Sequence, residues 1–127
     1  MARLLTKEDI RLILQSRFEN DECTRLGEIP KPSSLKDIAK ASKRIVRAIQ
    51  SQERIAIVGD YDVDGVISSV ILSQFFDDLG VDYSLIIPNR FTDGYGLNPE
   101  IVSKLDVHVI ITVDNGISAV EAAQICK

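Results

Sequence analysis

The stretch Ile55-Ala56-Ile57-Val58-Gly59-Asp60-Tyr61-Asp62-Val63-Asp64-Gly65 decides the fold of this chain. The apolar segment Arg54–Gly59 lacks any alternation of apolar and polar residues, which predicts a strand buried on both faces of a parallel sheet. Three carboxylates then follow at alternate positions, where that strand should end. Crowded like charges raise one another's pKa values unless a metal ion or a basic group neutralises them. Because carboxylate oxygens suit hard cations such as Mg²⁺, Mn²⁺ or Ca²⁺, we expect a metal site here.

Strands and helices alternate from Arg54 onward. Further strands are predicted at residues 82–88 and 107–113, and helices at residues 66–79, 99–105 and 118–126. This order predicts an α/β fold with three layers, in which right-handed crossovers link parallel strands and helices flank the sheet. An antiparallel sheet with helices on one face is less favoured, because no hairpin turn appears.

A fourth acid, Asp114, follows the last predicted strand. In open parallel sheets, ligands bind beyond the carboxyl ends of the strands, where the strand order reverses. If the strand order is 2-1-3, the first and third strands are neighbours. Asp60, Asp62, Asp64 and Asp114 would then form one site.

The N-terminal part of the chain, before the α/β pattern, is predicted to contain a helix and a linker but no strand. Thr6 to Phe18 is predicted to be a helix, since Thr6 and Asp9 have the spacing of a capping box. Residues 20–34 contain Gly and Pro residues that break any periodicity, and Ser34 is then expected to cap a second helix with an apolar face. We therefore divide the chain into a helix and linker at residues 1–33 and an α/β part at residues 34–127.

Composition excludes several classes of protein. The 127 residues carry a formal net charge of −4, which argues against a free-standing nucleic-acid clamp. No run of about 18 apolar residues is present, so we expect no transmembrane helix. Acidic residues come too early for a signal peptide, and Cys23 and Cys126 are too far apart for a CxxC motif. A cytoplasmic location fits best.

The motif Gly59–Gly65 has other possible interpretations. An EF-hand loop would need a bidentate Glu where Ile71 stands, and a helix where the strand is predicted, so we reject it. A haloacid-dehalogenase-like phosphatase would use Asp62 as a nucleophile directly after the strand. Here Gly59-Asp60-Tyr61 intervenes, and this interpretation remains the second choice.

Three blocks carry a family resemblance: IAIVGDYDVDGVISS at 55–69, IIPNRFTDGYGLN at 86–98 and VIITVDNGIS at 109–118. Together they resemble the first motifs of DHH-family phosphoesterases, most closely those that act as single-stranded-DNA exonucleases. The resemblance runs from about Ile29 to the last residue. It implies a phosphodiesterase with two Mn²⁺ or Mg²⁺ ions, acting on single-stranded DNA from 5′ to 3′ in repair and recombination. Enzymes of the family that cleave short oligonucleotides or cyclic dinucleotides remain alternatives.

The resemblance also implies roles for individual residues. Asp62, Asp64 and Asp114 would be catalytic metal ligands, with Asp60 as a further ligand. Roles in binding the substrate are expected for Asn89, Arg90 and Tyr95. Ser68 is expected to help bind phosphate for a separate reason: it lies in the first turn of a helix predicted to begin at Val66, where backbone N–H groups are free. Tyr95 is equally compatible with simple loop packing. We expect His108 to pack or hydrogen-bond at a sheet face, and Phe75 and Phe76 to lie in the core.

One departure from the family pattern matters. The Asp-His-His motif would follow Asp114, and it does not occur before Lys127. We therefore expect an N-terminal fragment with weak metal binding and doubtful catalysis, or a remnant without catalytic activity. An open sheet edge would favour self-association.

Overall fold

A computed structural model describes residues 4–18 and 25–126, and these residues fall into two compact units that divide after Ile38. In the first unit, α1 spans Lys7–Arg17, and short 3₁₀ helices span Leu26–Glu28 and Pro32–Ser34. The predicted capping box is confirmed: the backbone N–H of Asp9 donates to Thr6 Oγ1 at 3.1 Å, and that of Thr6 donates to Asp9 Oδ2 at 2.8 Å. The sequence-based boundary at 33/34 stays a prediction, and Cys23 lies outside the described residues.

The predicted cap of the second helix is wrong. Helix α2 spans Ile38–Gln50 and begins four residues after Ser34. Ser34 instead ends a 3₁₀ turn, and its hydroxyl donates to the carbonyl of Lys31 at 2.7 Å. Pro32 favours this turn because its ring fixes φ for the first helical position. Asp37 then adopts φ 59°, a left-handed conformation that separates the turn from α2.

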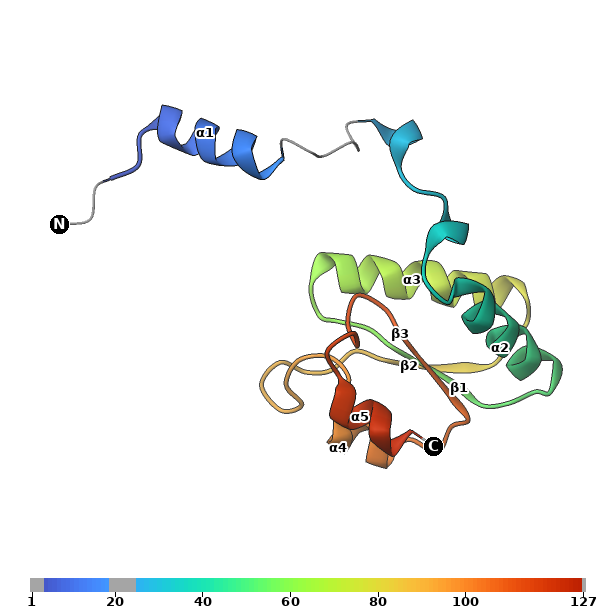
Figure 1. Cartoon of the computed structure of the whole chain (residues 1–127). Helices are drawn as coiled ribbons and strands as arrows, with labels where there is room; N and C mark the ends of the chain where they lie inside the picture. Colours follow the sequence, from blue (N-terminus) through green and yellow to red (C-terminus); the bar gives the residue numbers. More distant parts are fainter. Residues whose placement is uncertain (1–3, 19–24, 127) are drawn as a thin grey trace. The chain divides into compact units, whose positions relative to one another are not determined.

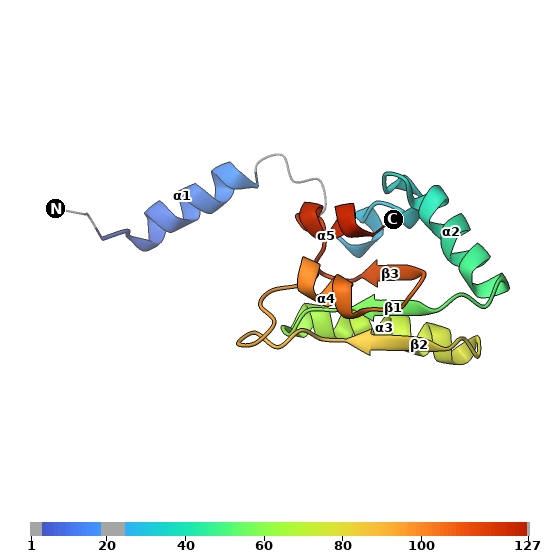
Figure 2. The ribbon, with the colours of Figure 1, turned by 90° about the horizontal axis from the view of Figure 1, so that it is seen from below.

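The second unit is built on a three-stranded parallel sheet in the order β2-β1-β3, which confirms the prediction. The strands are β1 at Ile55–Val58, β2 at Tyr83–Ile86 and β3 at Val109–Thr112. Figure 2 shows the three arrows pointing the same way, with β1 in the middle. All four residues of β1 are buried, as its continuous apolar sequence predicted.

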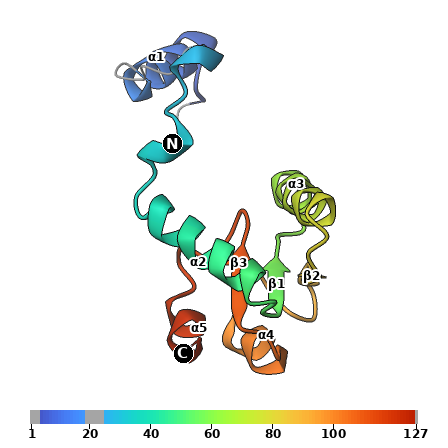
Figure 3. The same ribbon diagram turned by 90° about the vertical axis from the view of Figure 1, so that its right-hand side faces the viewer.

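Helices cover both faces of this sheet. Helices α2 and α3 (Val63–Asp78) lie on one face, and α4 (Pro99–Lys104) and α5 (Val120–Ile125) on the other (Figures 1 and 3). The core on the first face is formed by α2, β1 and α3. Its buried residues are Ala48 of α2, Ile55 and Ile57 of β1, and Phe76 of α3. The predicted three-layer α/β fold is confirmed.

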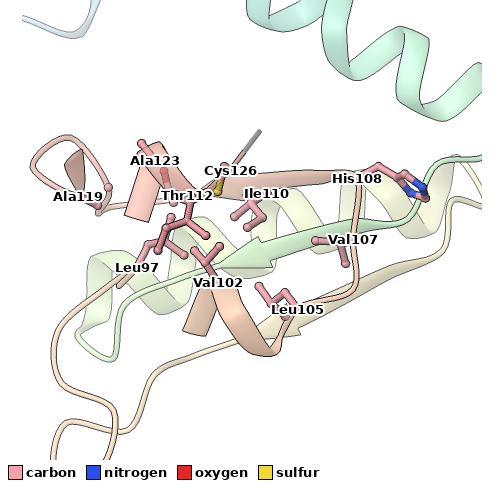
Figure 4. A pocket seen from close by; sticks show the side chains of 12 residues that line it. Leu97, Val102, Leu105, Val107, His108, Ile110, Thr112, Ala119, Ala123 and Cys126 are labelled. Carbon is pink, nitrogen blue, oxygen red and sulfur yellow. The ribbon is translucent and has the colours of Figure 1, made fainter. Parts of the chain in front are cut away.

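The opposite face holds a pocket of about 450 Å³ between β3, α4 and α5, lined mostly by apolar residues but also by His108 and Thr112. Figure 4 shows side chains of Val102, Ile110 and Ala123 around it. The carboxylates that follow β1 and β3 do not line this pocket. Across the two described stretches of the chain, no helix combines the length and apolar character needed to cross a membrane.

Two predictions about the core were only partly right. Phe76 is completely buried, whereas Phe75 remains 52% exposed, because neighbouring helical residues point in different directions. In α2, Ile45 and Ile49 pack against the core, but Val46 is exposed.

Candidate metal centre

The first acid after β1 is held inside the protein. Asp60 is 1% exposed, and its Oδ1 accepts a hydrogen bond from the backbone N–H of Tyr61 at 2.7 Å. The first turn of α3 passes directly over it: a Cβ built on Gly65 would lie 2.6 Å from both the Cβ and the carbonyl oxygen of Asp60. Glycine at position 65 therefore allows the helix to approach this buried carboxylate.

The second acid begins the helix. Asp62 is the N-cap of α3, and its Oδ1 accepts a hydrogen bond from the backbone N–H of Gly65 at 3.0 Å. The helix thus starts at Val63, three residues earlier than predicted, since Asp is a good N-cap and acids in the first turn complement the helix dipole. Ser68 consequently lies beyond the first turn, and its contact with phosphate stays a prediction. Asp64 lies in the first turn.

The third acid follows β3 in a left-handed turn. Asp114 has φ 59° and Gly116 has φ 98°, and Asp114 is exposed. Asp tolerates the left-handed region better than most residues with a side chain. This turn brings Asp114 back toward the end of the neighbouring strand β1.

The carboxylates of Asp60, Asp62 and Asp114 meet at this edge of the sheet. Each offers one oxygen, and these oxygens all lie within 4.8 Å of one another. Partial loss of solvation and then the charge of Asp62 raise the pKa of the Asp114 carboxyl above its ordinary value. Asp64 lies outside the group of three, although its charge acts on Asp114 in the same direction.

The loop of residues 89–98 lies next to these acids, at the edge to which the arrowheads in Figure 2 point. The Tyr95 hydroxyl donates to the carbonyl of Asp114 at 3.4 Å, and the negative charge of Asp60 is the largest cause raising the pKa of that hydroxyl. The rings of Tyr95 and Tyr61 meet edge to face, with 6.2 Å between centroids. The Arg90 guanidinium lies 5.8 Å from the centroid of the Tyr61 ring.

Asn89 shapes the same loop. Its side-chain oxygen accepts a hydrogen bond from the N–H of Phe91 at 2.9 Å, and its own N–H donates to Asp93 at 2.8 Å. Of the residues expected to meet substrate, Tyr95 contacts Asp114, Arg90 lies over the Tyr61 ring, and Asn89 organises the turn. Their contacts with substrate remain predictions.

Two residues outside the acidic group complete the description. His108 Nδ1 accepts a hydrogen bond from the backbone N–H of Arg54 at 3.0 Å, at the end of the sheet opposite the acids, so it hydrogen-bonds as expected. Asn115 was not among the predicted site residues, because Asn followed by Gly is typical of an ordinary turn. Its side chain makes three hydrogen bonds: to Val58 at the end of β1, to Val113 just after β3, and to Leu97 in the loop.

Comparison with known proteins agrees with this geometry. The profile of the "DHH family, N-terminal domain" matches residues 54–127. The single-stranded-DNA-specific exonuclease RecJ of Bacillus subtilis is 35% identical over 125 residues, covering 91% of this chain and 16% of that protein. RecJ of Escherichia coli is 41% identical over 91 residues, covering 67% of this chain and 15% of that protein.

A solved structure also matches. The crystal structure of exonuclease RecJ bound to manganese aligns with a TM-score of 0.62 and 36% identity, covering 66% of this chain and 22% of that one. The chain thus spans about 16% of the length of its Bacillus subtilis relative. With a family match over residues 54–127 and the strand order that brings its acids together, this chain belongs to the DHH family, as an N-terminal domain.

Proposed function

We propose that the acidic group forms a divalent-metal centre for hydrolysis of phosphodiester bonds in single-stranded DNA, as part of a 5′ to 3′ exonuclease in repair and recombination. One observation carries the proposal: carboxylates from the ends of two separate strands converge at one edge of the sheet. The names of the relatives support the substrate class, and the manganese in the RecJ crystal structure supports the metal.

The donor set fits a hard cation. A cation that holds its oxygens at about 2.1 Å places them about 3 to 4.2 Å apart. The oxygens of Asp60, Asp62 and Asp114 lie within 4.8 Å of one another, so small side-chain rotations suffice. Because the group contains only carboxylates, we expect both Mn²⁺ and Mg²⁺ to bind, with little discrimination.

The residues around the ion would divide the work. Bound divalent ions would activate a water molecule and stabilise the leaving oxygen of the phosphodiester. Asp60, Asp62 and Asp114 would hold the ion, and Asp64 could contribute to a second one. Burial of Asp60 beneath the first turn of α3 fixes its position before any ion binds, which lowers the entropic cost of binding.

The loop of residues 89–98 would position the substrate. Arg90 carries a positive charge over the Tyr61 ring and can pair with a backbone phosphate. Tyr61 and Tyr95 present aromatic surface on which a base can stack, an interaction that tolerates any sequence. An exonuclease that is not sequence-specific needs this combination.

The free thiol of Cys126 agrees with a reducing compartment, and we include a cytoplasmic location in the proposal.

The test is a Mn²⁺ titration of this chain followed by electron paramagnetic resonance, in which the signal of the free ion disappears on binding. We expect Asp62→Asn and Asp114→Asn each to weaken binding by roughly tenfold or more, because each removes an anionic ligand. Asp78→Asn, at the far end of α3, is the matched control and should bind like the wild type. Wild-type affinity in both site variants would refute the metal centre.

The substrate class has its own test. We expect a fluorescent oligodeoxythymidine to bind in the presence of Mg²⁺, and Arg90→Ala to weaken that binding. Unlabelled single-stranded DNA should displace the probe better than duplex DNA or a cyclic dinucleotide. Displacement mainly by the cyclic dinucleotide would favour the alternative family activity, and failure to bind any of them would favour a non-catalytic remnant.

A further inference from the structure

We propose that Asn115 is a positioning residue of this metal centre. Its side-chain amide joins the ends of β1 and β3 to the loop of residues 89–98, and thereby holds the Asp114 carboxylate at the edge of the sheet. The inference rests on the proposed function, since it gives Asn115 a role in preparing the site for the cation.

Every polar atom of the Asn115 amide is used. Its Nδ2 donates to the carbonyl of Val58 at 3.0 Å and to that of Val113 at 2.9 Å. Its Oδ1 accepts from the backbone N–H of Leu97 at 3.2 Å. The orientation of the amide follows from these partners, because a flipped amide would turn its oxygen toward two carbonyls and its NH₂ toward an N–H.

These contacts lie immediately before the acids. Val58 is the last residue of β1, two positions before Asp60, and its carbonyl also accepts from the N–H of Val113 at 3.1 Å. Val113 and Asn115 flank Asp114. The amide therefore fixes the spacing between the two strand ends that deliver acids to the site.

The loop is held by close packing as well. A Cβ built on Gly96, which has φ 58°, would lie 3.0 Å from the Cβ of Asn115. Next to this contact, the Tyr95 hydroxyl reaches the carbonyl of Asp114. The loop of residues 89–98 and the turn that carries Asp114 therefore both contact the side chain of Asn115.

A simpler role as a turn former does not account for these contacts. Asn at a turn bonds its own backbone nearby or points into solvent. Here the side chain is half-buried, and two of its three hydrogen bonds reach residues distant in sequence, Val58 and Leu97. Replacing a residue that holds a metal ligand in place, without binding the metal itself, typically weakens metal affinity roughly 10–100-fold.

The test compares Asn115→Ala with Ala48→Gly in the whole chain. Ala48 is buried in the core on the α2 and α3 face, so its replacement lowers stability without touching the acids. We expect Asn115→Ala to weaken Mn²⁺ binding at least about tenfold, and Ala48→Gly to keep the wild-type affinity. Equal affinities in Asn115→Ala and the wild type would overturn the inference, and so would a loss in Ala48→Gly as large as that in Asn115→Ala.

A second measurement needs neither a variant nor a metal ion. In metal-free wild-type protein, we expect the side-chain NH₂ protons of Asn115 and the Leu97 amide to exchange with water much more slowly than the exposed side chain of Gln124. Exchange as fast as that of Gln124 overturns the positioning role, even where Asn115→Ala does not fold. If the wild type shows slow exchange but no Mn²⁺ binding, the proposed metal centre is refuted, whereas the hydrogen bonds of Asn115 are confirmed.

Discussion

Replacing Gly65 by alanine sets two effects of known size against each other. Within a helix, alanine is favoured over glycine by about 0.8–1.0 kcal/mol. Against this, the new Cβ would lie 2.6 Å from the Cβ and the backbone oxygen of Asp60. Backbone atoms cannot move aside as a flexible side chain can, and overpacking of this kind costs about 1–3 kcal/mol or more. We therefore expect a net loss of stability of up to about 2 kcal/mol.

Urea unfolding followed by circular dichroism measures this change. Gly27→Ala is the control, because a Cβ at Gly27 meets nothing within 4 Å. A loss of 1 kcal/mol corresponds to a fall of roughly 4–8 °C in the melting temperature of a domain of this size. Mn²⁺ affinity should fall together with stability, since the first turn of α3 must move away from Asp60. If Gly65→Ala is about 1 kcal/mol more stable than the wild type, helix propensity alone accounts for the change in stability. The close approach of α3 to Asp60 would then be refuted.

Three further predictions address the acids, the core and the domain boundary. In metal-free buffer, wild-type protein should gain stability relative to Asp114→Asn as the pH falls from 7: an acid whose pKa is raised by folding binds its proton more tightly in the folded chain. A difference in melting temperature that stays constant down to pH 4 would contradict this. Phe76→Ala should cost about 3–5 kcal/mol in urea unfolding, and Phe75→Ala much less, because Phe75 stays half exposed; equal losses would count against the packing of α3. Removal of residues 1–33 should leave the unfolding midpoint unchanged, since α1 contributes no buried residue, and a clear fall in the midpoint would show that this segment stabilises the fold.

The sheet and the meeting of the acids could be predicted because both follow from local patterns. A continuous apolar strand followed by acids marks the middle of a parallel sheet, and a second such strand ending in Asp114 supplies its neighbour. The capping box of α1 was also readable, since Thr6 and Asp9 need only each other.

Features that depend on contacts between residues distant in sequence could not be predicted from local patterns. The start of α3 was placed too late, because Gly65 suggests a loop and its close approach to Asp60 becomes visible only in three dimensions. The hydrogen bonds of Asn115 reach Val58 and Leu97, and the sequence does not say which carbonyls an Asn in a turn will meet. The left-handed Asp37 that delays α2 has no clear signal either.

The central claim is that strands β1 and β3 bring their acids to one shared cation. Paramagnetic broadening of backbone amide signals by substoichiometric Mn²⁺ tests it most directly, with Mg²⁺ as the diamagnetic control. We predict that the amides of residues 60–64 and those of residues 113–115 broaden together, while that of His108, at the other end of the sheet, stays sharp. Broadening confined to one of the two segments, or spread evenly over the acids of the chain, would contradict the account.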